Sequence, residues 1–443
     1  MSTGRSSSKK SLMVFLSTFL LIGLLGSEMY ATNGYFAHGY GTRYKAMAGA
    51  GVALYLSPLG VATNPAVISF LGRQVYIGTA LFNPNREYTV SGNPSGFPGT
   101  FPLTPGTVKS DSKWFVVPSA AVSITTPTGL ALGLAIYGNG GMNTDYPTKT
   151  FDNPQLTFNP PTGVNLAQLF VAGTFAYKFA PNQSIGLTGI FAFQQFKAEG
   201  LFAFGGFSSD PTKLTNNGNA NSTGFGARVG YLGDFGIVSL GASYQTKISM
   251  SEFDKYAGLF AEQGDFDIPA NWTVGVAVKA TPIITLAADI QKIMYSDIAS
   301  IAHPLDLQNN SPVLQNGQPN PNFQPLGSDG GWGFGWEDMT VVKIGAQLKP
   351  IPGFAVRAGF STGSQPIPDS EVMFNILAPG VIEKHFTLGF SKALAPKVTL
   401  NVAGMYAPSK SVVGPNPFEA PNQQTIELKM NQFEADASVS ITL

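Results

Sequence analysis

Apolar and polar residues alternate along fourteen segments between Val75 and Leu443. Successive side chains of a β-strand point to opposite faces, so this alternation is typical of strands with one apolar face. The pattern predicts strands at residues 75–88, 115–125, 130–138, 166–179, 184–197, 223–232, 237–248, 271–280, 283–297, 339–349, 354–363, 384–393, 397–408 and 430–443.

The connections between these segments alternate in length. A very short turn, such as residues 126–129 or 180–183, follows each even-numbered segment. The connections after odd-numbered segments run to roughly 15 to 40 residues rich in Asn, Pro, Gly and Ser, as in barrels with turns on one side of the membrane and loops on the other. The sequence therefore predicts an all-β fold, a 14-stranded antiparallel transmembrane β-barrel.

The two faces of the predicted strands differ in chemistry. In the last strand, Phe433 and Ala435 alternate with Glu434 and Asp436. In such a barrel the aliphatic face contacts lipid and the mixed face lines the lumen. A soluble β-sandwich also alternates, but it does not account for the loop lengths or for an export signal.

The N-terminus predicts export. Three basic residues, Arg5, Lys9 and Lys10, precede an apolar run at 12–25, and a small residue, Ala31, offers a cleavage site. The alternative, an anchoring helix, would need about 20 apolar residues. We therefore predict a signal peptide at 1–31, a plug, or hatch, at 32–73, where alternation is absent, and the barrel at 74–443.

Composition narrows the function classes. Charged residues make up 12% of the chain, against roughly 25% in soluble domains. Lys+Arg and Asp+Glu are equal at 26 each, which does not favour a nucleic-acid partner. The chain has no cysteine and therefore no thiolate metal site or disulfide.

Three groups of residues resemble motifs of the FadL/TodX family of outer-membrane transporters. They are Asn64-Pro65-Ala66, similar to the hatch signature, Pro269-Ala270-Asn271-Trp272 followed by Asp289, and Arg357-Ala358-Gly359-Phe360 followed by Pro366-Ile367-Pro368-Asp369. The resemblance covers nearly all of the mature chain. It implies a monomer in the outer membrane of a Gram-negative bacterium that takes up long-chain fatty acids or similar hydrophobic compounds and contacts outer-membrane lipids. The chain departs from the usual aromatic C-terminus of such barrels, because it ends in Leu443.

Apolar residues in the loops at 198–222 and 249–270 form the candidate capture site. The resemblance implies that these two loops bind the hydrophobic ligand first, and the alternative is that their aromatic residues only pack the loops together. A helix is predicted at 251–263, with Ser251 and Asp254 similar to a capping box. The candidate residues are Phe202, Phe204, Phe207, Phe253, Tyr256, Leu259 and Phe260.

Three basic residues, Arg228, Lys343 and Arg357, lie on the predicted lumen face. They could bind a carboxylate, since an unpaired buried charge is costly. The alternative is that they pair with lumen acids such as Asp289 or Asp436.

Two features could interrupt the barrel wall. Pro118 lies in the second predicted strand and cannot donate a hydrogen bond to a neighbour. Gly138, Gly140 and Gly141 end the third strand. The resemblance implies a side opening here, through which ligand leaves into the membrane, and the alternative is that the glycines simply begin a loop.

The sequence offers little for catalysis. His38, His303 and His385 are the chain's three histidines, and no Gly-x-Ser-x-Gly or His-Glu-x-x-His motif occurs. We therefore predict a transporter that is not an enzyme and has no cofactor or metal. The alternatives are a general diffusion porin for polar solutes and, less favoured, an outer-membrane lipase.

Overall fold

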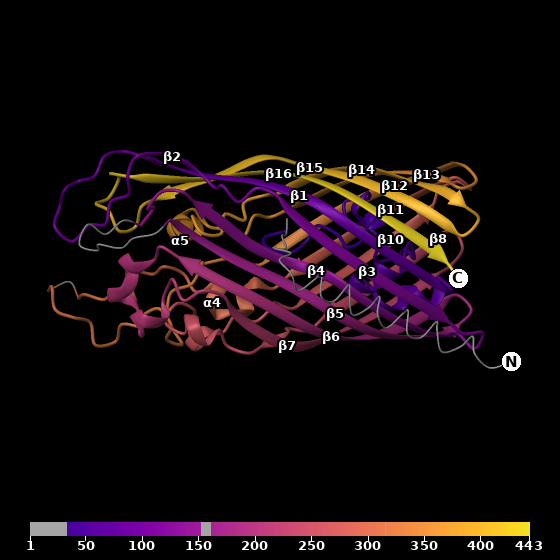
Figure 1. Cartoon of the computed structure of the whole chain (residues 1–443), viewed down its shortest axis with the longest axis horizontal. Coiled ribbons are helices and arrows are strands. Elements are labelled where there is room, and N and C mark those ends of the chain that lie inside the picture. The colour runs from indigo at the N-terminus through magenta and orange to yellow at the C-terminus, as the bar shows by residue number, and fades with distance from the viewer. Residues whose placement is uncertain (1–32, 152–160, 315) are drawn as a thin grey trace.

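The computed structural model describes residues 33–151, 161–314 and 316–443, in which fourteen strands form a closed antiparallel β-barrel (Figure 1). Each strand of the ring pairs with its neighbours in chain order, and β16 pairs with β1 from Gln74–Thr442 to Ser91–Thr425, which closes the ring. The ring consists of β1 Gln74–Ser91, β3 Phe115–Thr125, β4 Leu130–Tyr146, β5 Thr162–Ala180, β6 Gln183–Glu199, β7 Ala220–Asp234, β8 Val238–Gln245, β10 Asn271–Lys279, β11 Ile284–Ile293, β12 Met339–Ile351, β13 Phe354–Gly363, β14 Lys384–Ala395, β15 Val398–Pro415 and β16 Thr425–Thr442.

All fourteen predicted strands are confirmed, although some are longer than their alternation indicates. β4 continues to Tyr146 and β15 to Pro415, through stretches without a regular apolar face. Two short strands, β2 Gly106–Lys109 and β9 Ser249–Met250, pair with β1 and β7 at the long-loop end of the barrel.

The predicted faces of the strands are also observed. Large apolar side chains such as Phe225 and Leu388 point outward, with 70% and 62% of their surface exposed. Charged side chains such as Arg357 and Asp436 point inward and are buried. An apolar outer band around a polar interior is the arrangement that a lipid bilayer requires of a barrel. Among the described residues, no helix has the length and apolar character needed to cross a membrane.

The segment from Asn33 to Arg73 lies inside the barrel and forms the predicted plug. Its helices are α2 Thr42–Lys45, η1 Pro58–Ala62 and η2 Pro65–Phe70. Residues along its whole length, such as Met47, Val52 and Ile68, are fully buried. The predicted signal peptide at 1–31 lies outside the described residues and stays a prediction.

The long connections gather at one end of the barrel, opposite the end where the C-terminus lies (Figure 1). They hold short helices: η3 Phe202–Phe207, η4 Pro211–Lys213, η5 Asp254–Tyr256, α3 Ala261–Gly264, η6 Tyr295–Asp297, α4 Ala299–Ala302, η7 Asp369–Glu371 and α5 Val372–Asn375.

The predicted helix at 251–263 is wrong. The Ser251 hydroxyl accepts a hydrogen bond from the Thr223 amide instead of capping a helix. Glu262 and Gln263 have positive φ angles, and the Gln263 amide donates to the Gly327 carbonyl at 2.9 Å. Hydrogen bonds to the neighbouring loop thus replace those that a continuous helix would form.

We expect the long connections to face the outside of the cell. Lys213 lies exposed in a long connection, and Lys397 lies exposed in the short turn between β14 and β15. In intact cells, a membrane-impermeant maleimide should label Lys213→Cys and should not label Lys397→Cys. The reverse pattern would contradict the orientation.

Candidate functional site

Acidic residues of the wall hold the plug in place. The Lys45 ammonium forms ion pairs with Glu434 at 2.9 Å and with Asp436 at 3.2 Å. The Asp289 carboxylate accepts hydrogen bonds from the Gly51 amide at 2.7 Å and the Val52 amide at 2.9 Å. Charge-assisted bonds of this kind are strong where water is excluded. The acids that the sequence offered as partners for lumen cations therefore bind the plug instead.

The three predicted lumen cations are buried and contact neutral acceptors. Arg228 on β7 donates to the Gln245 side chain. Lys343 on β12 donates to the His38 carbonyl of the plug at 3.0 Å. Arg357 on β13 donates to Gln347 at 2.9 Å and to Ser391 at 2.7 Å. The three cations lie at separate places in the lumen wall and do not form one cluster with each other.

The hatch residue Asn64 joins three parts of the structure. Its amide nitrogen donates to the Val52 carbonyl and to the Tyr231 carbonyl of β7, both at 2.8 Å. Its side-chain oxygen caps η2 by accepting from the Ala66 amide at 3.0 Å. Pro65 occupies the first position of that helix, where its missing N–H has no cost. The Asn64-Pro65-Ala66 segment thus fixes the end of the plug against the wall.

Glycines of the wall leave room for the plug backbone. A Cβ atom at Gly359 would lie 2.2 Å from the Met47 carbonyl carbon, and one at Gly230 would lie 2.1 Å from the Asn64 side-chain oxygen. Both distances are far shorter than the closest approach that such atoms can make. The same holds for further wall glycines whose nearest neighbours are plug atoms, Gly186, Gly241 and Gly345.

The barrel wall is interrupted between β3 and β4. These strands pair only from Ala120–Ile136 to Thr125–Ala131, although β3 begins at Phe115 and β4 continues to Tyr146. We call this unpaired stretch, between residues 115–119 of β3 and 137–144 of β4, the side window.

The predicted wall residues lie at this window. Pro118 belongs to the part of β3 that does not pair with β4, where its missing N–H leaves no donor unsatisfied. β4 has a register shift between Gly138 and Gly140. Beyond the shift, the Gly141 amide donates to the Tyr35 carbonyl of the plug at 3.0 Å, so β4 pairs with the plug in place of β3. Every β4 residue from 135 to 144 is buried, which places this part of the strand inside the line of the wall.

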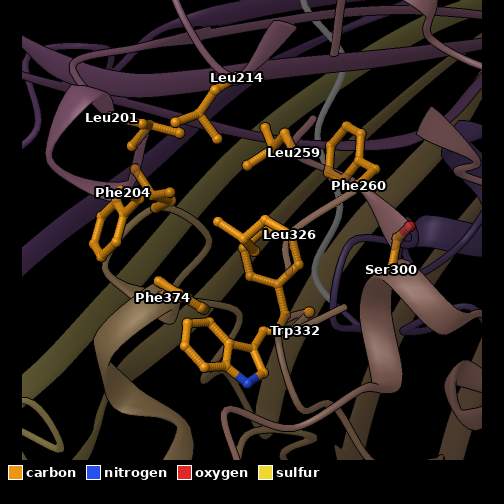
Figure 2. A pocket seen from close by; sticks show the side chains of 12 residues that line it. Leu201, Phe204, Leu214, Leu259, Phe260, Ser300, Leu326, Trp332 and Phe374 are labelled. Carbon is orange, nitrogen blue, oxygen red and sulfur yellow. The ribbon is translucent and has the colours of Figure 1, made fainter. Parts of the chain in front are cut away.

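An apolar cavity of about 40 Å³ lies among the long connections (Figure 2). Four connections contribute to it, and its one hydroxyl group, on Ser300, donates to the Asp265 carbonyl. The side chains that line it are Leu201, Phe204, Leu214, Leu259, Phe260, Ser300, Leu326, Trp332, Phe334, Phe374 and Leu377, with the backbone of Gly333.

The structure places five of the seven predicted capture residues in two groups. Phe204, Leu259 and Phe260 line the cavity. Phe253 and Tyr256 lie outside it, where both pack on Phe196 of β6 and anchor the loop. Loop packing and cavity formation therefore both occur, and Phe260 takes part in both, since its ring also lies 4.7 Å from that of Phe196.

The two remaining capture residues are not among those that line the cavity. Phe207 is half-buried, and its ring lies 5.7 Å from that of Trp332. Phe202 is half-buried in η3.

Sequence reasoning missed the part of the cavity that comes from the later connections. Trp332 and Phe334 lie in a loop between β11 and β12, and Phe374 and Leu377 lie between β13 and β14. The run Gly331-Trp332-Gly333-Phe334 carried a usable signal, because large aromatic residues are unexpected in a polar, glycine-rich loop.

One titratable group near the cavity is perturbed. Burial, together with the neighbouring Asp267 carboxylate, raises the pKa of Asp265 to about 7. Asp267 itself forms an ion pair with Lys247 at 2.6 Å. This shift favours the neutral, protonated form of Asp265 beside the apolar cavity.

These features define a class of protein: an outer-membrane β-barrel with an N-terminal plug in its lumen and an interrupted wall. The model of the family described as outer membrane protein transport protein (OMPP1/FadL/TodX) matches residues 24–442, and the chain belongs to this family. Its members are outer-membrane transporters for hydrophobic compounds. The protein is accordingly located in the outer membrane of a Gram-negative bacterium.

Solved structures show the same fold at low sequence identity. The Pseudomonas putida toluene transporter TodX has a TM-score of 0.64 at 18% identity, over 92% of this chain and 99% of that chain. A Pseudomonas aeruginosa FadL homologue has a TM-score of 0.63 at 14% identity, over 92% and 99%. The Ralstonia pickettii toluene transporter TbuX has a TM-score of 0.57 at 17% identity, over 92% and 99%. A comparison with curated proteins gave no match.

The close approach of plug and wall leads to a testable prediction. Gly359→Leu should force the plug away from β13, because the new side chain would overlap the Met47 backbone. We expect passive ion conductance in planar bilayers to rise at least severalfold. Gly189→Leu is the matched control, since a Cβ there meets no atom within 4 Å. Equal conductance of the two variants would contradict the role given to these contacts.

Proposed function

We propose that this protein takes up a long-chain fatty acid or a similar hydrophobic compound and releases it sideways into the outer membrane. The ligand enters at the loop cavity, passes beside the plug and leaves through the side window. The interrupted β3–β4 pairing is the observation that carries this proposal. The closure of the ring within one chain, between β16 and β1, supports action as a monomer.

Capture at the loops is supported by the chemistry of the cavity. Its lining is almost entirely apolar, and its single hydroxyl is already bonded to the loop backbone. An apolar cavity of about 150 Å³ can hold benzene, so a ligand of that size must move side chains to enter a space of about 40 Å³. Leu259 is half-buried and lies at the rim of the cavity. A change of its side-chain rotamer would open an entrance for the ligand.

A second cavity supports passage from the loops to the window. It has a volume of about 30 Å³ and is lined by Gly141 and Met142 of the inward part of β4, by Phe82 of β1 and by Trp336. This space therefore adjoins the side window on the lumen side. The two small cavities mark the beginning and the end of the proposed route.

Lateral release suits an apolar cargo. Such a molecule gains roughly 25 cal/mol for each Å² that is kept out of water, and transfer from the lumen into lipid retains that free energy. Transfer into the aqueous periplasm would lose that free energy. A general diffusion porin for polar solutes instead needs an open lumen, and here the plug fills it with residues such as Met47 and Val52. The absence of catalytic activity stays a prediction that family membership supports.

The capture step predicts a difference between two phenylalanines of one loop. Phe260 and Phe253 are both buried and both stack on Phe196, but Phe260 alone lines the cavity. Phe260→Ala removes on the order of 50 Å² of ligand contact, worth about 1.2 kcal/mol, and should weaken binding of a fluorescent fatty acid roughly five- to tenfold. Phe253→Ala should leave the affinity within about twofold of wild type. Similar losses in both variants, each with a heat-resistant barrel in gels, would place the entry site elsewhere.

The release step predicts the effect of removing the irregularity in β4. Deleting Asn139, which lies between the two glycines of the register shift, should let β4 continue its pairing with β3 and close the window. Uptake of a hydrocarbon or fatty acid by cells should fall at least tenfold, while affinity at the loop cavity stays near that of wild type. Undiminished uptake by a correctly folded deletion variant would refute lateral release.

A further inference from the structure

A second site lies at the opposite end of the barrel. A cavity of about 580 Å³ opens among the short turns that follow β12 and β14, and we call it the vestibule. Its lining combines plug residues with the ends of the wall strands. The residues that matter here are Arg43, Tyr55 and Leu56 of the plug and Ile283, Lys349 and Arg357 of the wall.

Neutral groups hold the two arginines of the vestibule. The buried Arg357 guanidinium donates to Gln347 and Ser391 at 2.9 and 2.7 Å. The Ser391 hydroxyl donates to the Asn401 side-chain oxygen at 2.7 Å, and Arg43 donates to the same oxygen at 2.7 Å. A second nitrogen of Arg43 donates to the Leu56 carbonyl at 2.6 Å. Ser391 and Asn401 thus bridge the two positively charged guanidinium groups. The groups that accept hydrogen bonds from Arg43 and Arg357 carry no negative charge.

No ion pair between described residues includes Arg43, Lys349 or Arg357. Asp234 does contact the lining, through a 2.9 Å hydrogen bond from the Tyr55 hydroxyl. Its charge is already matched by Lys279 at 3.1 Å. Among the described residues, therefore, three cations line one cavity without an acidic ion-pair partner.

Cations that lie together without an acidic partner cost free energy unless a bound anion neutralises them. A buried guanidinium without a charged partner loses hydration that neutral acceptors replace only in part. Elsewhere in this lumen the wall does supply carboxylates, as it does for Lys45. A planar carboxylate fits the fork of an arginine and gains charge-assisted hydrogen bonds. Beside the cations, Tyr55 and Leu56 are half-buried and offer apolar surface.

We propose that the vestibule binds an organic anion, with its carboxylate on Arg357, Lys349 and Arg43 and its apolar body against Tyr55 and Leu56. The site lies at the end of the barrel that faces the periplasm if the long connections face outward. It is separate from the loop cavity, and its binding does not depend on capture or on lateral release.

Benzoate is a suitable probe, because benzamide and benzylamine keep its ring and change only the charged group. We expect calorimetry on the full barrel in phosphatidylcholine nanodiscs to show benzoate binding at least tenfold tighter than either analogue. Inorganic phosphate, which lacks an apolar body, should bind severalfold more weakly than benzoate. Lys349→Gln should weaken benzoate binding severalfold, and Arg357→Gln at least tenfold.

Lys397→Gln is the matched control, since this exposed lysine lies in a neighbouring short turn and does not line the vestibule. It should bind benzoate as wild type does. Equal affinity for benzoate and benzamide, or for benzoate and phosphate, would overturn the proposal. If Arg357→Gln fails to fold, the Lys349→Gln variant tests the proposal instead, because Lys349 is exposed. Unchanged benzoate binding in Lys349→Gln would overturn the proposal.

Discussion

The contact between the plug and the inner wall is the constraint on which the rest of this structure depends. A barrel of fourteen strands encloses more space than its own side chains fill, and the plug occupies that space. Two devices make the fit possible: wall carboxylates that bind Lys45 and the amides at Gly51 and Val52, and wall glycines, such as Gly359, that admit the plug backbone. Charge-assisted bonds and close packing together hold the plug against the wall.

A filled lumen also explains why the wall opens. With the axial route occupied, β4 leaves its pairing with β3 and bonds instead to the plug at Tyr35. The plug therefore supplies hydrogen-bond partners that this part of β4 would otherwise lack. Hydrogen-bonding groups at such an opening need partners, because lipid offers none.

Much of the fold could be predicted from the sequence, because period-two alternation and connection length report directly on which face meets lipid. All fourteen strands followed from these two signals, as did the lumen-facing side of Arg228, Lys343 and Arg357. The loops could not be predicted in the same way. The segment at 251–263 has helical spacing, yet Gln263 bonds to Gly327, some sixty residues further along. The capture cavity likewise needs Trp332 and Phe374 from distant connections. The aromatic run around Trp332 marks its loop as unusual, but no local pattern reports which other connections that loop contacts.

Our central proposal is that the plug closes the axial route, so that only an apolar molecule leaves, and leaves sideways. Single-channel recording of the wild-type protein in planar bilayers tests this claim most directly. The account predicts no large, steady ion conductance, and apolar ligands should not create one. A large and stable conductance of the kind given by an open diffusion pore would contradict it.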